Sequence, residues 1–187
     1  MVRRDHSDEA AHSVNAEFIS GNYFRTFGLQ PRVGRLLMDA DDTQGATPTA
    51  VMSFQTWQHE FAGDPSVVGS TFLVNTKPVT VVGVAPQGFF GDRLMSTPPD
   101  FYLPIGTMNA LANAPYVNDP ESDWLYIIGR VKPGVQTAAL QVKLSQMLRQ
   151  IFATHQIFSA GPGKDSLPKV HIVLTPGGDG MAWAERK

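Results

Sequence analysis

Histidine and carboxylate side chains could bind a metal ion, but their spacing in this sequence does not favour a site. The five histidines are far apart, and none stands at metal-ligand spacing from another. Asp39, Asp41 and Asp42 form one acidic stretch, yet the residues after it do not supply the alternating ligands and distal glutamate of an EF-hand loop. We therefore predict a solvated turn whose carboxylates bind local backbone N–H groups, and no metal site. The histidines are His6, His12, His59, His155 and His171.

Nucleophilic and nucleotide chemistry also lack their usual residue patterns. The chain has no cysteine, which excludes thiolate catalysis and disulfides. No serine stands in a G-x-S-x-G elbow, and no phosphate-binding glycine motif is present. Gly83, Gly88 and Gly91 are not followed by a helix start with a basic residue, so we interpret them as strand ends and turns. We predict no catalytic residue, no cofactor and no enzymatic activity.

A second acidic cluster lies beside a tryptophan and could line a sugar site. Asp119, Glu121 and Asp123 precede Trp124 in a loop rich in Asn, Ala and Pro. Paired carboxylates act on sugars only across a cleft, which a sequence cannot locate. A solvated loop is the favoured interpretation. A ligand-binding module for a sugar or peptide, built from residues 109–123 and Trp124, stays as the alternative.

Short strands and helices must position these residues. Apolar and polar residues alternate over Ser13–Ile19, which predicts a strand. Ser20 is a suitable N-cap for a short helix that ends at Gly28. Ser53 caps a second helix that ends at Gly63. The aromatic residues at helical spacing are predicted to be core: Tyr23, Phe24, Phe27, Phe54, Trp57 and Phe61.

A β-hairpin is the clearest element in the middle of the chain. Its two runs, Ser70–Val74 and Val79–Val84, are rich in Val, Phe and Thr. Residues 75–78 between them predict a loop slightly longer than two residues. Pro78 cannot donate a ladder hydrogen bond, so we place it first in the second strand or on an edge.

The C-terminal third predicts a βαβ unit. Trp124–Val131 and Lys169–Leu174 resemble strands, and the helix between them is predicted over about Thr137–Thr154. Such a crossover is expected to be right-handed. The helix carries a broad apolar stripe formed by Leu140, Leu144, Met147 or Leu148, and Ile151.

Composition limits the class of protein. The 187 residues include 42% hydrophobic and 17% charged residues, enough apolar material for a core. The net charge of −2 leaves no basic footprint for nucleic acid. With 14 prolines and 17 glycines, a mixed α/β protein is favoured over a helical bundle. No apolar run reaches the roughly 18 residues of a spanning helix, and the first residues do not read as a signal peptide.

An ordered set of short segments resembles a known family. The segments are Phe18–Phe24 (FISGNYF), Gly28-Leu29, Gly34-Arg35, Asp41-Asp42, Ala50–Ser53, Trp57, Phe61, Gly63–Gly69 (GDPSVVG), Val81–Pro86 (VVGVAP), Gly88-Phe89, Pro104 and Gly129–Val135 (GRVKPGV). In this order, over about residues 12–180, they resemble the MacB-like periplasmic core domain of ABC transporter permeases of the MacB/FtsX type. Within this family, these sequence segments are most similar to those of large permeases of the acidobacterial type.

The resemblance implies an α+β fold of two subdomains. A porter-like βαβ layer would comprise residues 12–19 plus 123–176, and an inserted module of mixed sheet and short helices would comprise residues 20–122. Residues 1–11 and 177–187 would be flexible ends. The family's first strands and membrane helices are expected to be missing from this piece, an excised soluble domain. Gln136 stands where the family often has a Ser or Asn cap, so Thr137 is expected to cap the long helix.

The resemblance also implies a function. We expect an extracytoplasmic domain on the periplasmic face of the bacterial inner membrane, which transmits conformational change in efflux, lipoprotein handling or signalling. Its partners would be its own membrane helices, an ABC ATPase and a periplasmic adaptor protein, and a homodimer is a further expectation. ATP hydrolysis would belong to a separate domain or subunit, and no nucleic acid is expected as a partner. The alternative is a secreted module that binds a sugar or peptide.

Overall fold

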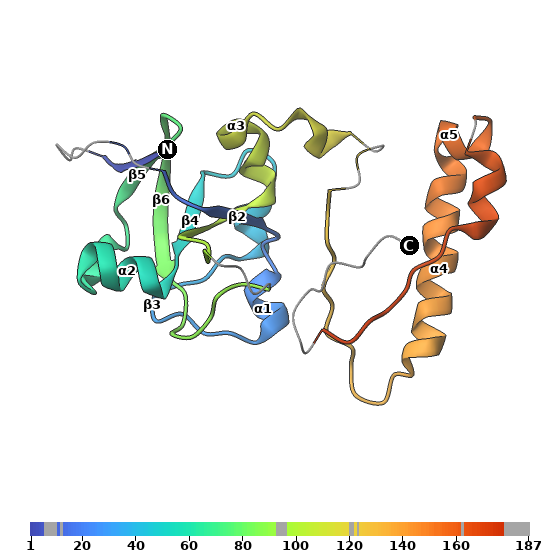
Figure 1. The fold of residues 1–187 in the computed structure, drawn as a ribbon, viewed down its shortest axis with the longest axis horizontal. Coiled ribbons are helices and arrows are strands. Elements are labelled where there is room, and N and C mark those ends of the chain that lie inside the picture. The colour runs from blue at the N-terminus through green and yellow to red at the C-terminus, as the bar shows by residue number, and fades with distance from the viewer. Residues whose placement is uncertain are drawn as a thin grey trace. The chain divides into compact units, whose positions relative to one another are not determined.

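The computed structural model describes residues 1–5, 11, 13–92, 97–119, 122, 124–161 and 163–177. The chain forms two compact units, of which the first contains Met1–Ile128 and the second begins at Gly129. Figure 1 shows a sheet with short helices in the first unit and helices in the second. The α+β class predicted from the sequence is therefore confirmed.

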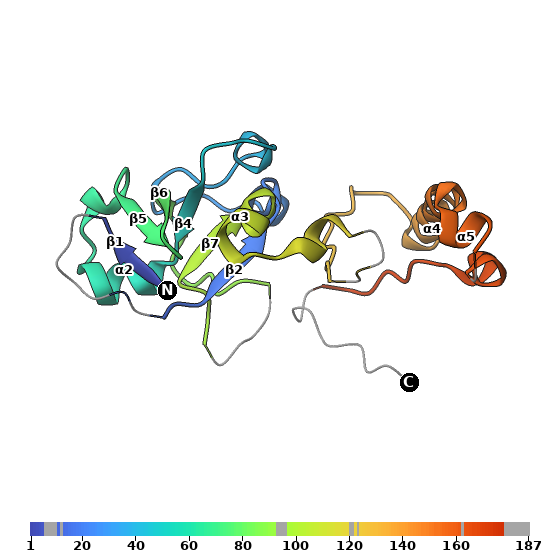
Figure 2. The same cartoon turned by 90° about the horizontal axis from the view of Figure 1, so that it is seen from above.

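In the described residues, seven strands form one mixed sheet in the first unit. Their order is β1-β5-β6-β4-β7-β2, and β3 pairs with β6 beside this path. Figure 2 shows β5, β6, β4, β7 and β2 following one another across the unit. The strands are β1 (Val2–Arg4), β2 (Ala16–Ile19), β3 (Val33–Gly34), β4 (Thr49–Met52), β5 (Thr71–Val74), β6 (Lys77–Val84) and β7 (Phe101–Pro104).

Both faces of the sheet centre are covered by apolar side chains. Because side chains alternate along a strand, Ala50 and Met52 of β4 enter one core while Val51 enters the other. Helix α2 (Phe54–Phe61) contributes Trp57 to the first core. Helix α1 (Tyr23–Phe27) contributes Tyr23 and Phe24 to the second. This two-sided burial makes the sheet centre a close-packed apolar layer.

The predicted hairpin is present, with a shorter loop than expected. Asn75 and Thr76 form the two-residue connection and have φ angles of 47° and 71°, as a type I′ turn requires. Pro78 is the second residue of β6, opposite Leu73, and β6 begins to pair with β4 only at Thr80. The missing N–H of the proline therefore costs no ladder bond.

The predicted helices form, but their caps differ in part. Ser53 caps α2 as predicted, since its Oγ accepts a hydrogen bond from Thr56 N. Gly28 ends α1 in the left-handed conformation, also as predicted. Ser20 does not cap α1: its hydroxyl donates to Asn22 Oδ1, and Asn22 takes the N-cap position without a capping bond.

The N-terminal residues are more ordered than the sequence suggests. The prediction of a flexible end over residues 1–11 is wrong for Val2–Arg4, which form β1 against β5. The edge of β5 supplies ladder partners, and Val2 is buried in the core with 3% exposure. Residues 6–10 and 178–187 lie outside the described residues.

The second unit contains the long helix at the predicted bounds. Helix α4 (Thr137–Thr154) is followed by α5 (Gln156–Ser159) and a 3₁₀ turn, η5 (Lys164–Lys169). No side chain caps α4, so the expected Thr137 cap is wrong. Among the helices in the described ranges, none has the length and apolar character needed to span a bilayer.

The two strands predicted around α4 do not form in the described residues. Residues 124–131 and 170–174 have no strand partner there. The latter segment instead binds the helix itself: Ile172 N donates to Ser145 Oγ, and Leu174 N donates to Gln141 Oε1. Side chains of α4 thus take the place of a sheet neighbour. β2, which the subdomain division assigns to the porter-like layer, pairs with β7; the division itself stays a prediction.

Candidate functional site

The first acidic stretch is structural. Arg35 donates to both oxygens of Asp41 at 2.6 and 2.8 Å, and Met38 N donates to Asp41 Oδ2 at 2.8 Å. The Asp41 residue is only 7% exposed. The hydrogen bonds from Arg35 hold the pKa of the Asp41 carboxyl below its ordinary value, with help from Met38 N and the Arg35 charge. Instead of the expected solvated turn, Asp41 is a buried carboxylate in an ion pair whose Arg35 partner is partly exposed.

The neighbouring carboxylates are also engaged. Asp39 pairs with Arg25 at 2.9 Å, with both side chains largely exposed. Asp42 accepts from Gly21 N at 3.1 Å and from Gly106 N at 2.7 Å, which ties three segments of the first unit together. The sequence predicts bonds to local backbone N–H groups, whereas Asp39 binds a side chain and Asp42 binds backbone N–H groups that are distant in sequence.

The second acidic cluster is only partly described. Asp119 accepts from the Ser122 hydroxyl at 2.9 Å, whereas Glu121 and Asp123 lie outside the described residues. Trp124 packs edge-on against Tyr116, with ring centroids 5.7 Å apart. Trp124 lines the cavity described below, and Asp119 does not.

The glycines and histidines do not converge on a ligand. Gly83 allows β3 and β6 to approach, since a Cβ atom there would lie 2.1 Å from the Arg35 carbonyl oxygen. His59 and His171 are exposed, and His155 caps the end of α4. His6 and His12 are outside the described residues. In the described ranges, no three His, Cys, Asp or Glu side chains gather as a metal site would require.

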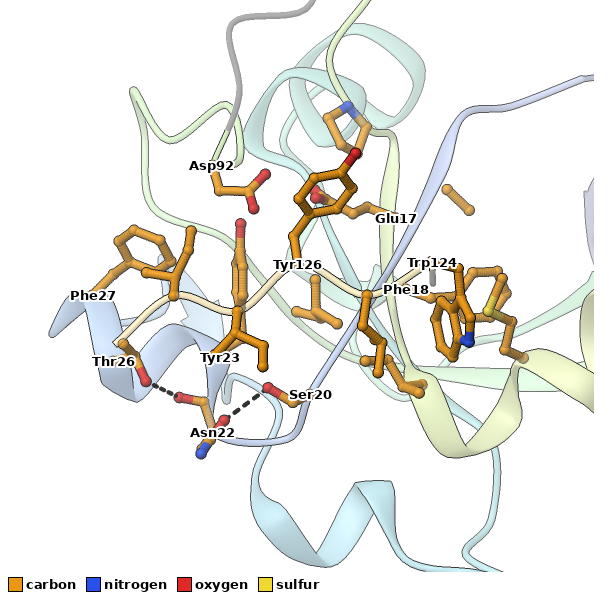
Figure 3. Close-up of a pocket in the computed structure, with 18 of the residues that line it drawn as sticks. Glu17, Phe18, Ser20, Asn22, Tyr23, Thr26, Phe27, Asp92, Trp124 and Tyr126 are labelled. Carbon is orange, nitrogen blue, oxygen red and sulfur yellow. Dashed lines mark hydrogen bonds between the residues drawn. The ribbon is translucent and has the colours of Figure 1, made fainter. Parts of the chain in front are cut away.

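A cavity of about 890 Å³ lies in the first unit beside β2 (Figure 3). Sequence reasoning missed it because its walls come from three separate segments, and no local pattern joins them. The lining consists of residues 14–20, Asn22, Tyr23, Thr26 and Phe27, then Asp92, Thr97, Pro99, Ile105 and Met108, and finally residues 124–128.

The sheet edge and helix α1 position the polar groups of this cavity. Glu17 projects from β2, the edge strand, and Tyr23 from the first residue of α1. Tyr23 is 9% exposed, and among the described residues its hydroxyl group has no partner with good hydrogen-bond geometry, although the nearby Asp92 backbone N–H partly offsets the rise in its pKa. Figure 3 shows this hydroxyl at the end of the cavity where Asp92 lies.

Two tyrosines share this electrostatic environment. Burial, together with the carboxylates of Glu17 and Asp92, raises the pKa of the Tyr23 phenol well above its ordinary value. The same causes raise the pKa of Tyr102, which is fully buried beneath. A Cβ atom on Gly91 would lie 3.2 Å from Glu17 Oε2 and 3.9 Å from the Tyr102 hydroxyl oxygen. Both phenols therefore stay neutral and can donate or accept hydrogen bonds.

The rest of the lining is apolar and aromatic. Phe27, Trp124 and Tyr126 each present a ring to the cavity, and Tyr23 packs edge-on against Phe27 with centroids 5.0 Å apart. Among the described lining residues none is basic. The volume is within the usual range of small-molecule pockets. The arrangement can hold a ligand by apolar and electrostatic contacts.

Comparisons with known proteins give a consistent result. Residues 2–147 match the profile of the MacB-like periplasmic core domain. Two curated relatives are macrolide export ATP-binding/permease proteins MacB. The protein of Salmonella paratyphi A is 30% identical and that of Salmonella choleraesuis 29% identical, each over 140 residues and 73% of this chain. The matched region spans about one fifth of those relatives, 20% of their length.

A solved structure shares the fold. The periplasmic region of MacB from Actinobacillus actinomycetemcomitans aligns with a TM-score of 0.55 and 20% sequence identity. The alignment covers 80% of this chain and 61% of that one.

Proposed function

The chain belongs to the family of MacB-like periplasmic core domains, and from this premise we propose that it transmits conformational change between the membrane part of an ABC-type permease and periplasmic partners. The match over residues 2–147 is the observation that carries the proposal. Efflux, lipoprotein handling or signalling would be the process served. The two relatives are named for macrolide export, which makes efflux the first process to test.

The packing of the first unit supports a rigid-body role. Strand β4 is buried along its whole length, and apolar clusters cover both faces of the sheet centre. Packed layers of this kind are bistable at their boundaries and stiff within, so they move as units. Partner contact and motion would thus be carried by surfaces, and ATP hydrolysis by a separate domain or subunit.

Reading-frame context tests the permease assignment. Apolar segments of about twenty residues on both sides of this domain would support it, because that length spans a bilayer. A signal peptide directly before the domain and a stop codon directly after it would contradict it.

Transmission can be measured with spin labels, since the chain has no native cysteine. In the full-length protein, with its other cysteines replaced, one label pair would be placed within the first unit by Gln44→Cys and Glu60→Cys. A second pair would join the units by Gln44→Cys and Lys143→Cys. All three residues are exposed. ATP is expected to leave the first distance distribution unchanged and to shift the second.

Two outcomes would refute this role. Unchanged distributions in both pairs would exclude transmission through this domain. If the distance within the first unit shifted as much as the distance between the units, motion of the first unit as a rigid body would be excluded.

A further inference from the structure

The cavity beside β2 combines negative charge with aromatic walls. Glu17 and Asp92 are partly buried carboxylates in its lining, and both act on the buried phenols of Tyr23 and Tyr102. Burial weakens solvent screening, so a charge inside this space interacts more strongly than one on an open surface. The lining therefore favours a positively charged guest.

The buried hydroxyl of Tyr23 is a second, independent pointer to a ligand. Tyr23 is about nine-tenths buried, and in the described part of the chain only the Asp92 backbone N–H approaches its hydroxyl, without the geometry of a hydrogen bond. A buried polar group without a partner carries a desolvation cost that a ligand donor or acceptor at this position would remove. The Tyr23 residue lines the cavity, and its hydroxyl lies at the end where Asp92 is placed (Figure 3).

We propose that this cavity binds an amphiphilic organic cation, that is, an ammonium or similar cation carrying apolar groups. The carboxylates of Glu17 and Asp92 would face the charge, and the Tyr23 hydroxyl would bind a polar group of the guest. The rings of Phe27, Trp124 and Tyr126 would contact the apolar groups or the cation itself. The binding does not require the permease role to hold.

Other ligand classes fit less well. An anion would meet two carboxylates and, in the described lining, no basic side chain. A bare metal ion needs several converging oxygens, and the described residues hold no such group of three acidic or histidine side chains. A neutral sugar can stack on the aromatic rings but would leave the charges of Glu17 and Asp92 without a counter-charge. An organic cation with apolar groups can contact both the carboxylates and the aromatic walls of the cavity.

Two probes of nearly the same shape and opposite charge test the proposal on the 187-residue chain. Tetraphenylphosphonium is the cation, and tetraphenylborate is the matched anion. Isothermal titration calorimetry is expected to show at least about tenfold tighter binding of the cation, the effect of placing charge beside aromatic faces and partly buried carboxylates. Amide chemical-shift changes are expected within residues 14–27 and 124–128.

Charge-removing variants check the source of the selectivity. The double variant Glu17→Gln and Asp92→Asn is expected to weaken tetraphenylphosphonium binding by about tenfold and to leave tetraphenylborate no weaker. Glu60→Gln, an exposed residue of α2, is the control and should bind as the parent does.

Three results would overturn the proposal. They are equal or tighter binding of tetraphenylborate by the parent, no binding of the cation at millimolar concentration, or shift changes confined to other residues. The probe comparison uses the parent protein, so it decides the question even where the double variant fails to fold. The spin-label experiment on the full-length protein tests the transmission role separately.

Discussion

Replacing Asp41 by asparagine is expected to lower the free energy of unfolding of the first unit by about 2 kcal/mol at pH 7. Asp41 accepts two hydrogen bonds from Arg35 and one from Met38 N, and its side chain is 8% exposed. The variant loses the charge and turns one acceptor into an amide donor facing a guanidinium. Both changes leave a buried group poorly paired.

The magnitude lies between two limits. Breaking a fully buried ion pair costs about 3–5 kcal/mol, and an exposed pair contributes about 0–1 kcal/mol. The carboxylate side of this pair is buried, but the Arg35 side chain is 41% exposed. Solvent therefore screens part of the interaction, so the expected loss of unfolding free energy lies between the values for an exposed and a fully buried pair.

The pH dependence of this loss has a defined sign. Hydrogen bonds from Arg35 and Met38 N lower the pKa of Asp41 in the folded state relative to the unfolded chain. Its stabilising contribution is therefore complete above the unfolded value of about 3.9 and disappears as the pH falls through the folded pKa. The difference between parent and variant should shrink in that acidic window and stay constant from pH 5 to 7.

Urea denaturation followed by circular dichroism, at a series of pH values from 7 downward, measures this difference. Hydrogen exchange of the buried amides of β4 (Thr49–Met52) assigns the change to the first unit. Asp39→Asn is the matched control on the same turn, because its partner is exposed and the expected loss is below about 0.5 kcal/mol. A loss below 0.5 kcal/mol for the Asp41 variant, or one that does not shrink in acid, would refute the reasoning.

Three further changes have clear expected outcomes. Gly83→Ala should lower the free energy of unfolding by at least about 3 kcal/mol, as measured by urea denaturation, because its Cβ atom would lie 2.1 Å from the Arg35 carbonyl oxygen. A loss under 1 kcal/mol would mean that β3 can move away. Thr76→Gly should raise the free energy of unfolding by about 1 kcal/mol, because it removes the strain of a threonine at φ 71°. An unchanged free energy of unfolding would show that the turn is unstrained. Ser145→Ala should speed exchange of the Ile172 amide roughly tenfold, since Ser145 Oγ is its acceptor; an unchanged rate would indicate another acceptor.

Local signals explain the elements that the sequence predicts well. Ser53 followed by an apolar face predicts α2, and Gly28 predicts the end of α1. The bounds of α4 follow from an apolar repeat between the Pro133-Gly134 turn and the residues after Thr154. Capping and periodicity depend on residues within one or two turns of each other, which a single sequence contains.

The errors concern pairing between distant residues. β1 forms because the edge of β5, about seventy residues later, accepts it. Residues 124–131 have the composition of a strand but no neighbour with which to pair in the described structure. Composition indicates that a segment suits a sheet, and only the tertiary fold decides whether a partner edge is present.

The candidate site shows the same limit more strongly. Glu17 and Tyr23 are only six positions apart, yet Asp92 and Trp124 join them through the fold. The sequence predicts a solvated turn at Asp41, and the structure assigns that carboxylate to an ion pair with Arg35. The informative signal, two carboxylates whose charges act on buried phenols, exists only in three dimensions.

The position of the cavity within the first unit bears on the proposed role. Its inner wall is β2, which pairs with β7 and so belongs to the stiff sheet. Its other wall, residues 124–128, has no strand partner within the described ranges, and Ile127 is 91% exposed. This wall runs directly into Gly129, where the second unit begins. A guest that contacts both walls would restrain the segment that connects the units, so, under the proposed transmission role, the free energy of binding is expected to depend on the proposed motion.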